Sequence, residues 1–316
     1  MTRQIPPALS GVFAALPTPY GPDGTPSNDA LHRILDFLLR KRIKGFCIGG
    51  VTGEYASCSV EERISLFRSV ALRADGQAGL ILGVGAERVS DVLRLARAAA
   101  DCGADAVLLP PPSFFRFEST DLVDFLRRTG ADLPLPALLY NIPQFANKLG
   151  IENILHLIET VPNIIGVKDS SGQLLNLPLI HEAKTRTPMI FFIGSDELFI
   201  QALEHDADGT ISGTASACPE LMLAAHEAHG SGQQERATLL QGQIEEFCVS
   251  GAEFPSPWTI KLALKARGID TGDWVWPVGE HMRLKMEKFQ KWFSAWSKTC
   301  ETTWSASGNE SIANVK

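Results

Sequence analysis

The 316-residue chain lacks most of the features that assign a sequence to a class at first sight. Its 6 cysteines are scattered, without a Cys-x-x-Cys pair or a cysteine–histidine cluster at zinc spacing, which argues against a disulfide framework and favours a reduced, cytoplasmic location. No apolar run approaches the about 18 residues that a membrane span requires. Basic residues number 29 against 36 acidic ones, and this lack of a basic excess argues against nucleic acid or a membrane as the partner.

Familiar catalytic motifs are missing as well. The sequence has no Gly-x-Ser-x-Gly, no His-Glu-x-x-His and no P-loop. Gly83-Val84-Gly85 begins like a dinucleotide-binding turn, but Arg88 stands where the third glycine would be. The missing third glycine weakens the case for a doubly wound sheet, which usually carries that glycine pattern after its first strand.

What is present is a regular alternation of short apolar runs with segments of helical periodicity. The apolar runs predict strands at 11–16, 45–49, 80–84, 106–109, 137–140, 164–168, 191–193 and 209–212. Eight strands, each followed by a helix, over roughly 220 residues indicate an α/β fold of the (β/α)8 TIM-barrel type.

The pattern changes after residue 230. Segments 233–248, 259–265 and 280–296 have helical periodicity, and the last carries aromatic residues at spacings of three and four. Such a face favours packing onto the barrel over binding a partner. The sequence therefore predicts a barrel over 1–230, a C-terminal three-helix subdomain over 231–298 and a polar, disordered tail over 299–316.

In a barrel the functional residues lie where the strands end. The second predicted strand ends in Gly50-Val51-Thr52, a loop with backbone N–H groups and a hydroxyl suited to a carboxylate or phosphate, although a plain glycine turn fits equally well. The fifth ends in Tyr140, one of only 3 tyrosines, which is either a proton shuttle or a filler of the barrel top.

The sixth predicted strand ends in Lys168. A lysine stem inside the barrel would be desolvated, which lowers the ammonium pKa and yields the neutral amine that attack on a ketone requires. The alternative is a structural pair with Asp169. Asp196 and Glu197 follow the seventh strand, where they either bind substrate hydroxyls or favour a helix N-terminus. An anion grip, a phenol and an amine together predict Schiff-base chemistry on a 2-oxo acid.

The motifs around these residues resemble those of the dihydrodipicolinate synthase/N-acetylneuraminate lyase family of Schiff-base aldolases. They lie in the same order at 15–19, 50–54, 140–143, 166–169, 194–197 and 209–212, within a resemblance that spans roughly residues 5–296. The resemblance implies a (β/α)8 barrel with a three-helix C-terminal domain, assembled as a homotetramer or homodimer. It also implies a lyase that needs no metal or organic cofactor, because the protonated imine is the electron sink.

The resemblance also implies roles for single residues. Lys168 would form the imine with pyruvate or a longer 2-oxo acid, and Tyr140 would serve as acid and base. Thr52 and the backbone N–H groups beside it, from Gly50 to Val51, would bind the carboxylate. Ile211 would contribute its backbone carbonyl near the imine.

Three positions depart from the family pattern. Val51 replaces a threonine of the usual proton relay, and Phe115 lies in a stretch that usually supplies a tyrosine across a subunit interface. Phe145 stands where lysine-pathway synthases carry an arginine that grips the aldehyde's carboxylate. Such a charge-assisted contact contributes about 1.5–3 kcal/mol, or roughly ten- to over a hundredfold in binding.

The sequence therefore predicts a lyase acting on a 2-oxo acid whose second half is not a dicarboxylic aldehyde. One candidate is a 2-keto-3-deoxy sugar acid, with Asp196 and Glu197 near its hydroxyls, and the other is a more apolar aldehyde. A true dihydrodipicolinate synthase and a non-catalytic barrel that binds a 2-oxo acid are the alternatives. Cleavage, condensation and dehydration all stay open as the net reaction.

Overall fold

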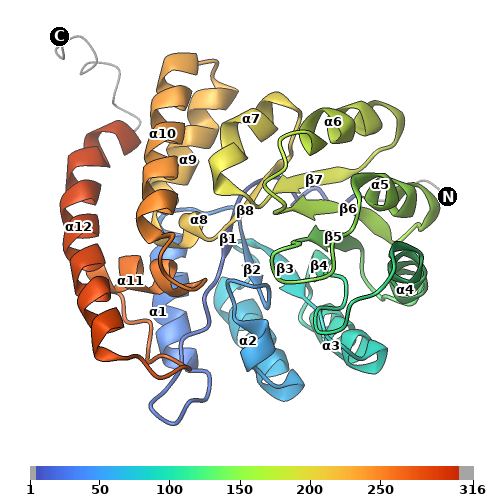
Figure 1. The fold of residues 1–316 in the computed structure, drawn as a ribbon, viewed down its shortest axis with the longest axis horizontal. Helices are drawn as coiled ribbons and strands as arrows, with labels where there is room; N and C mark the ends of the chain where they lie inside the picture. Colours follow the sequence, from blue (N-terminus) through green and yellow to red (C-terminus); the bar gives the residue numbers. More distant parts are fainter. Residues whose placement is uncertain (1–4, 306–316) are drawn as a thin grey trace.

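The computed structural model describes residues 5–305, and eight parallel strands in it close into a barrel in chain order (Figure 1). Each strand pairs with the next, and β8 pairs with β1. The strands are β1 (Gly11–Ala15), β2 (Gly45–Ile48), β3 (Gly79–Gly83), β4 (Ala106–Leu109), β5 (Ala137–Asn141), β6 (Ile164–Asp169), β7 (Ile190–Ile193) and β8 (Gly209–Ser212). The closed barrel confirms the predicted fold class.

Helices surround the strands, and a C-terminal group stands to one side of them (Figure 1). The barrel helices are α1 (Asn28–Arg40), α2 (Val60–Ala74), α3 (Val89–Asp101), α4 (Ser119–Ala131), α5 (Ile151–Thr160), α6 (Asn176–Arg186), α7 (Phe199–Glu204), α8 (Thr214–Ala217) and α9 (Pro219–Gly230). The C-terminal group is α10 (Gln234–Gly251), α11 (Trp258–Ala266) and α12 (Glu280–Trp304). Short 3₁₀ turns, η1 (Tyr55–Ser57) and η2 (Asp196–Leu198), follow β2 and β7. Within residues 5–305, no helix has both the length and the apolar character of a membrane span.

The barrel interior is filled by large apolar side chains, so it has no open channel. Phe13 and Phe192 meet edge to face with ring centroids 5.3 Å apart. Gly45 and Gly79 leave the room that the Phe13 ring occupies, because a side chain at either position would run into it. Tyr140 belongs to the same interior cluster and lies near the end of β5. Because these side chains fill the barrel interior, space for a site is left only at the ends of the strands.

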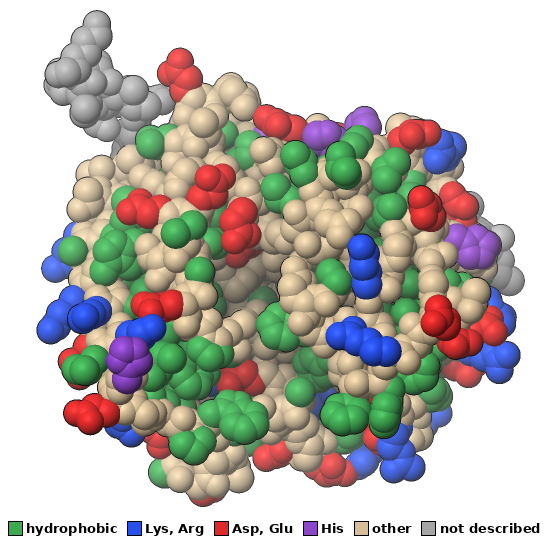
Figure 2. All heavy atoms as spheres, viewed as in Figure 1, with side chains coloured by type: hydrophobic (Ala, Val, Ile, Leu, Met, Phe, Trp, Pro, Cys, Tyr) green, Lys and Arg blue, Asp and Glu red, His purple; other side chains and the backbone are tan. Residues whose placement is uncertain are grey.

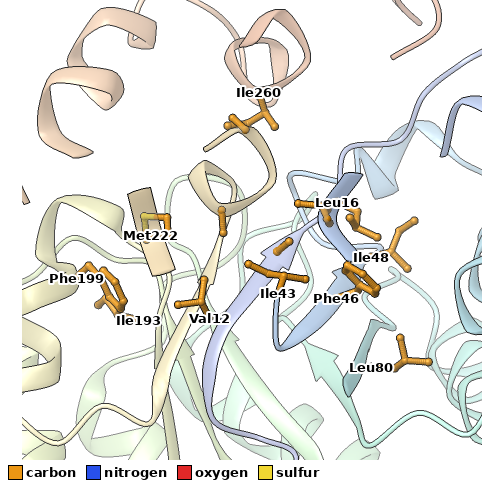
Figure 3. Packing of buried hydrophobic residues seen from close by; sticks show 14 of the residues in the cluster. Val12, Leu16, Ile43, Phe46, Ile48, Leu80, Ile193, Phe199, Met222 and Ile260 are labelled. Carbon is orange, nitrogen blue, oxygen red and sulfur yellow. The ribbon is translucent and has the colours of Figure 1, made fainter. Parts of the chain in front are cut away.

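A second apolar cluster fills the space between the strands and the helices and continues into the C-terminal group (Figure 3). Ile260 of α11 belongs to it together with barrel residues such as Val12 and Leu16. On α12, the ring of Phe293 lies 5.9 Å from that of Phe247 on α10, so the aromatic face of α12 packs against another C-terminal helix. The barrel and the C-terminal helices therefore share one core.

The predicted start of a disordered tail at residue 299 is wrong for its first residues. Helix α12 runs on to Trp304, because Cys300 and Trp304 extend the buried face of Trp296 at intervals of four residues. The indole Nε1 of Trp304 donates a hydrogen bond of 2.9 Å to Oε1 of Gln243. The rest of the predicted tail, 306–316, lies outside the described residues.

Candidate active site

The barrel brings Lys168 and Tyr140 together. They are direct neighbours in the register of β5 and β6, and each is only 4% exposed. The Lys168 ammonium lies 4.4 Å from the centroid of the Tyr140 ring. An amine and a phenol thus share one desolvated position at the C-terminal end of the barrel, as the sequence predicted.

Asp169, the neighbour of Lys168 in the chain, does not serve as its ion partner. Its Oδ1 accepts hydrogen bonds from Nδ2 of Asn141 at 2.9 Å and from the backbone N–H of Ser171 at 3.0 Å. Its Oδ2 accepts from Nδ2 of Asn176 at 2.9 Å. Because successive side chains of a strand point to opposite faces, Asp169 points away from the barrel interior. The alternative of a structural Lys168–Asp169 pair is therefore wrong.

A glycine at the end of β7 makes room for the Lys168 side chain. A Cβ atom at Gly194 would lie 2.7 Å from Cε of Lys168 and closer still to Oγ of Ser170. Both distances are far below van der Waals contact, so Gly194 keeps the path of the lysine open. Sequence reasoning noted Gly194 only as part of a motif, because nothing local connects it with Lys168.

The loop after β2, residues 50–54, has the properties of an anion-binding loop, and we call it the anion-grip loop. The N–H groups of Gly53 and Glu54 close turns onto the carbonyls of Gly50 and Val51 at 3.1 and 2.9 Å. Those of Val51 and Thr52 donate to no backbone carbonyl within residues 5–305. Gly50 lies against Tyr140, since a Cβ there would be 3.8 Å from the ring. Unused donors therefore lie close to the phenol, which supports the predicted carboxylate site.

This loop separates two cavities. One, of about 510 Å³, is lined by Val51 and Phe145 together with Trp258 and Trp276. The other, of about 310 Å³, is lined by Thr52, Asp196, Glu197, Thr214, Cys248 and Ser256, among others. The face seen in Figure 2 is hollowed near its centre, with acidic and basic side chains interspersed around the hollow. The predicted binding residues thus fall into an apolar set and a polar set.

Asp196 and Glu197 differ in their surroundings. Asp196 is 9% exposed, whereas Glu197 is exposed. Burial raises the pKa of the Asp196 carboxyl, and nearby hydroxyls of Thr214 and Ser212 oppose that rise. Its Oδ2 accepts from the N–H of Thr214 at 3.3 Å, while Oδ1 is buried without a well-formed hydrogen bond within residues 5–305. Asp196 therefore lines the polar cavity with a carboxylate whose buried Oδ1 lacks a well-formed hydrogen bond within residues 5–305.

Ile211 lies in β8 and is 1% exposed. It pairs with Phe13 in the register of β1 and β8, and its side chain belongs to the interior cluster. Only its backbone is left for a role near the imine, as the family resemblance implies. Within the described part of the chain, no three His, Cys, Asp or Glu side chains gather as metal ligands.

Tyr55 is among the residues of the site that sequence reasoning missed. Tyr55 follows the anion-grip loop directly and lines the apolar cavity beside Ser113. Burial raises the pKa of its phenol, although a hydrogen bond with Ser113 acts in the other direction. Its ring lies 5.3 Å from the guanidinium carbon of Arg63. Its position next to the loop and the scarcity of tyrosine were the only signals in the sequence.

Comparison with known proteins agrees with this geometry. Residues 8–295 match the model of the dihydrodipicolinate synthetase family. The chain belongs to this family. An N-acetylneuraminate lyase from Rhizobium meliloti (strain 1021) is 30% identical over 233 residues, 74% of this chain and 77% of the relative. A 4-hydroxy-tetrahydrodipicolinate synthase from Bacillus subtilis (strain 168) is 27% identical over 267 residues, 84% of this chain and 91% of the relative.

Solved structures show the same relationship. The Ruminococcus gnavus sialic acid aldolase superposes with a TM-score of 0.84 at 26% identity, covering 92% of this chain and 99% of that one. The family and these relatives are lyases of the class I, pyruvate-dependent aldolase type, and this family member is accordingly a lyase. The family is thus settled, and the substrate is the open question.

Proposed function

We propose that this enzyme forms a Schiff base between Lys168 and a pyruvate-type 2-oxo acid, and that Tyr140 moves protons at the reacting atoms. The observation that carries the proposal is the buried Lys168 ammonium against the Tyr140 ring, with Asp169 engaged elsewhere. The neutral amine attacks the ketone carbon, and loss of water from the carbinolamine gives the imine. The protonated imine then accepts the electron pair of the bond that breaks at the neighbouring carbon.

The anion-grip loop orients the substrate for that attack. The N–H groups of Val51 and Thr52, which meet no backbone carbonyl within residues 5–305, are suited, with the Thr52 hydroxyl, to the carboxylate of the 2-oxo acid. Such fixed donors place the ketone carbon at the amine and remove the cost of orienting the two groups during reaction. Tyr140 lies beside both the loop and the lysine, as a proton carrier requires.

For the second half of the substrate we propose a hydroxylated chain, as in a 2-keto-3-deoxy sugar acid. The polar cavity is lined by Thr52 and by Asp196, whose buried Oδ1 lacks a well-formed hydrogen bond within residues 5–305. A buried acceptor without a well-formed hydrogen bond carries a desolvation cost, which a substrate hydroxyl that reached it would relieve. Glu197, exposed at the same cavity, would meet the solvent end of the chain.

A more apolar aldehyde is the second candidate, and the other cavity supports it. Phe145, Trp258 and Trp276 give that cavity an aromatic wall. Among the described residues, neither cavity is lined by a lysine or arginine. The carboxylate of an acceptor such as aspartate semialdehyde would therefore meet no cation there, and we expect its condensation with pyruvate to be absent or very weak.

The first test is borohydride trapping with pyruvate, read by peptide mass spectrometry. A reduced pyruvyl adduct on the peptide that contains Lys168, absent from a Lys168→Arg control, is the expected result. No adduct with any 2-oxo acid would overturn the proposal and favour a binding protein without turnover. Two further assays then decide between the cavities. Cleavage of a 2-keto-3-deoxy sugar acid would favour the polar cavity, and condensation of pyruvate with an aromatic aldehyde would favour the apolar one.

The assembly and location stay predictions. Phe114 and Phe115 are 78% and 63% exposed, and Phe145 is 52% exposed. Large exposed aromatic side chains of this kind are typical of contact surfaces. We propose a homotetramer or homodimer, to be checked by light scattering after gel filtration, and a cytoplasmic enzyme, to be checked by fractionation.

A further inference from the structure

A buried ion pair lies directly beneath the anion-grip loop. The Lys261 ammonium, on helix α11, pairs with the carboxylate of Glu54, the residue that ends the loop. Their side chains are 1% and 7% exposed. The same ammonium lies 4.8 Å from the ring centroid of Tyr20 and 5.7 Å from that of Trp274. The Lys261 ammonium therefore contacts the segment after β1, the loop after β2 and the C-terminal region at the same time.

The backbone of Glu54 shows that the loop is held in an unfavourable shape. Its φ of 51° and ψ of 39° place it in the left-handed region, which costs a residue with a Cβ and usually selects glycine or asparagine. Neither could reach Lys261 with a carboxylate. A second contact holds the preceding residue, because Oγ1 of Thr18 donates a hydrogen bond of 2.6 Å to the carbonyl of Gly53. The requirement for the ion pair thus explains a glutamate at this position.

A contribution to overall stability is a weak explanation for such a pair. Desolvation of two charges offsets most of their attraction, so well-packed apolar residues often serve a fold equally well. Burial indeed lowers the pKa of Lys261 and raises that of Glu54. What apolar residues would not provide is a directional link between a helix and one particular loop conformation. That conformation is the one that leaves the N–H groups of Val51 and Thr52 unused.

We infer that Glu54 and Lys261 are positioning residues: their ion pair holds the loop donors in place for the substrate carboxylate, so the C-terminal helices set the affinity for 2-oxo acids. This inference rests on the proposed role of the loop. It concerns recognition of the carboxylate, and not the reactivity of Lys168. The two can therefore be measured separately with a ketone that has a carboxylate and one that lacks it.

The experiment compares borohydride trapping of pyruvate and of acetone by the full-length enzyme. In Lys261→Met we expect the half-saturating pyruvate concentration to rise at least tenfold, while the maximal trapping rate and the acetone rate stay within about twofold of wild type. Lys261→Arg, which keeps the charge, should recover part of the affinity. Lys265→Met is the matched control. The Lys265 ammonium, on the same helix, lies 5.4 Å from the ring centroid of Trp274, but it makes no ion pair with Glu54.

Equal losses with pyruvate and acetone, or an unchanged half-saturation in a folded variant, would overturn the inference. If Lys261→Met does not fold, Glu54→Gln removes the same charge pair with almost no change in size. Pyruvate binding is also read without chemistry, as the ligand-dependent rise in melting temperature of variants that carry Lys168→Ala. A wild type that binds pyruvate but is not trapped would contradict the proposed function while leaving the positioning role measurable in this way.

Discussion

Replacement of Gly194 by alanine is the sharpest test of the Lys168 geometry. The new Cβ would lie 2.7 Å from Cε of Lys168, whereas carbon atoms need about 3.5 Å. The lysine must therefore move by about 1 Å, and a misplacement of that size costs about a hundredfold in rate. Both crowded atoms, Cε of Lys168 and Oγ of Ser170, belong to side chains that can shift, so the fold loses only about 1–3 kcal/mol.

The assay is the initial rate of borohydride-trapped adduct at saturating pyruvate, measured well below the melting temperature. Gly242→Ala is the matched control, because a Cβ at that position in α10 meets nothing within 4 Å. We expect the control to trap at the wild-type rate and to be more stable by about 0.5–1 kcal/mol. A Gly194→Ala variant that is folded and traps within threefold of wild type would refute the reasoning.

Three further predictions test the cavities and the shared core. Phe145→Arg supplies a cation to the larger cavity and should raise condensation of pyruvate with aspartate semialdehyde at least tenfold over wild type, whereas no gain would contradict our account of this wall. Asp196→Asn should stabilise the enzyme by about 1 kcal/mol at pH 8. Burial raises the folded pKa of Asp196, so the stability that its protonated carboxyl contributes is lost as pH rises. Urea unfolding midpoints should therefore show a smaller advantage of the variant at pH 5 than at pH 8. Phe247→Ala should cost about 3–5 kcal/mol in a single unfolding transition, and two separate transitions would contradict a common core.

The fold was predictable because its signals are local. The strands β4 and β8 begin and end where the apolar pattern predicted. A capping box of Ser59 and Glu62 gives α2 a sharp start. The end of α12 was not predicted, since Cys300 and Trp304 are separated by polar residues and resemble a tail until Gln243 and the α10 face are in place. Long-range packing decided that boundary.

The barrel rule also found the central pair of the site. Strand ends pointed to Tyr140 and Lys168, and parallel register places them side by side. The choice between a reactive lysine and a pair with Asp169 was left open, although alternation along the strand favours one answer. Asp169, the next residue along β6, faces the opposite side of the strand, where Asn141 and Asn176 donate hydrogen bonds to its carboxylate.

Part of the cavity walls was beyond sequence reasoning, because it comes from a segment assigned to a separate subdomain. Ser256 lines both cavities, with Trp258 and Trp276 beside it in the larger one and Thr259 and Cys248 in the smaller. The C-terminal segment thus lines the space proposed for the second half of the substrate, and through Lys261 it reaches the loop proposed to hold the first half. We therefore expect substrate choice in this enzyme to depend on residues outside the barrel, where strand-end rules carry no information.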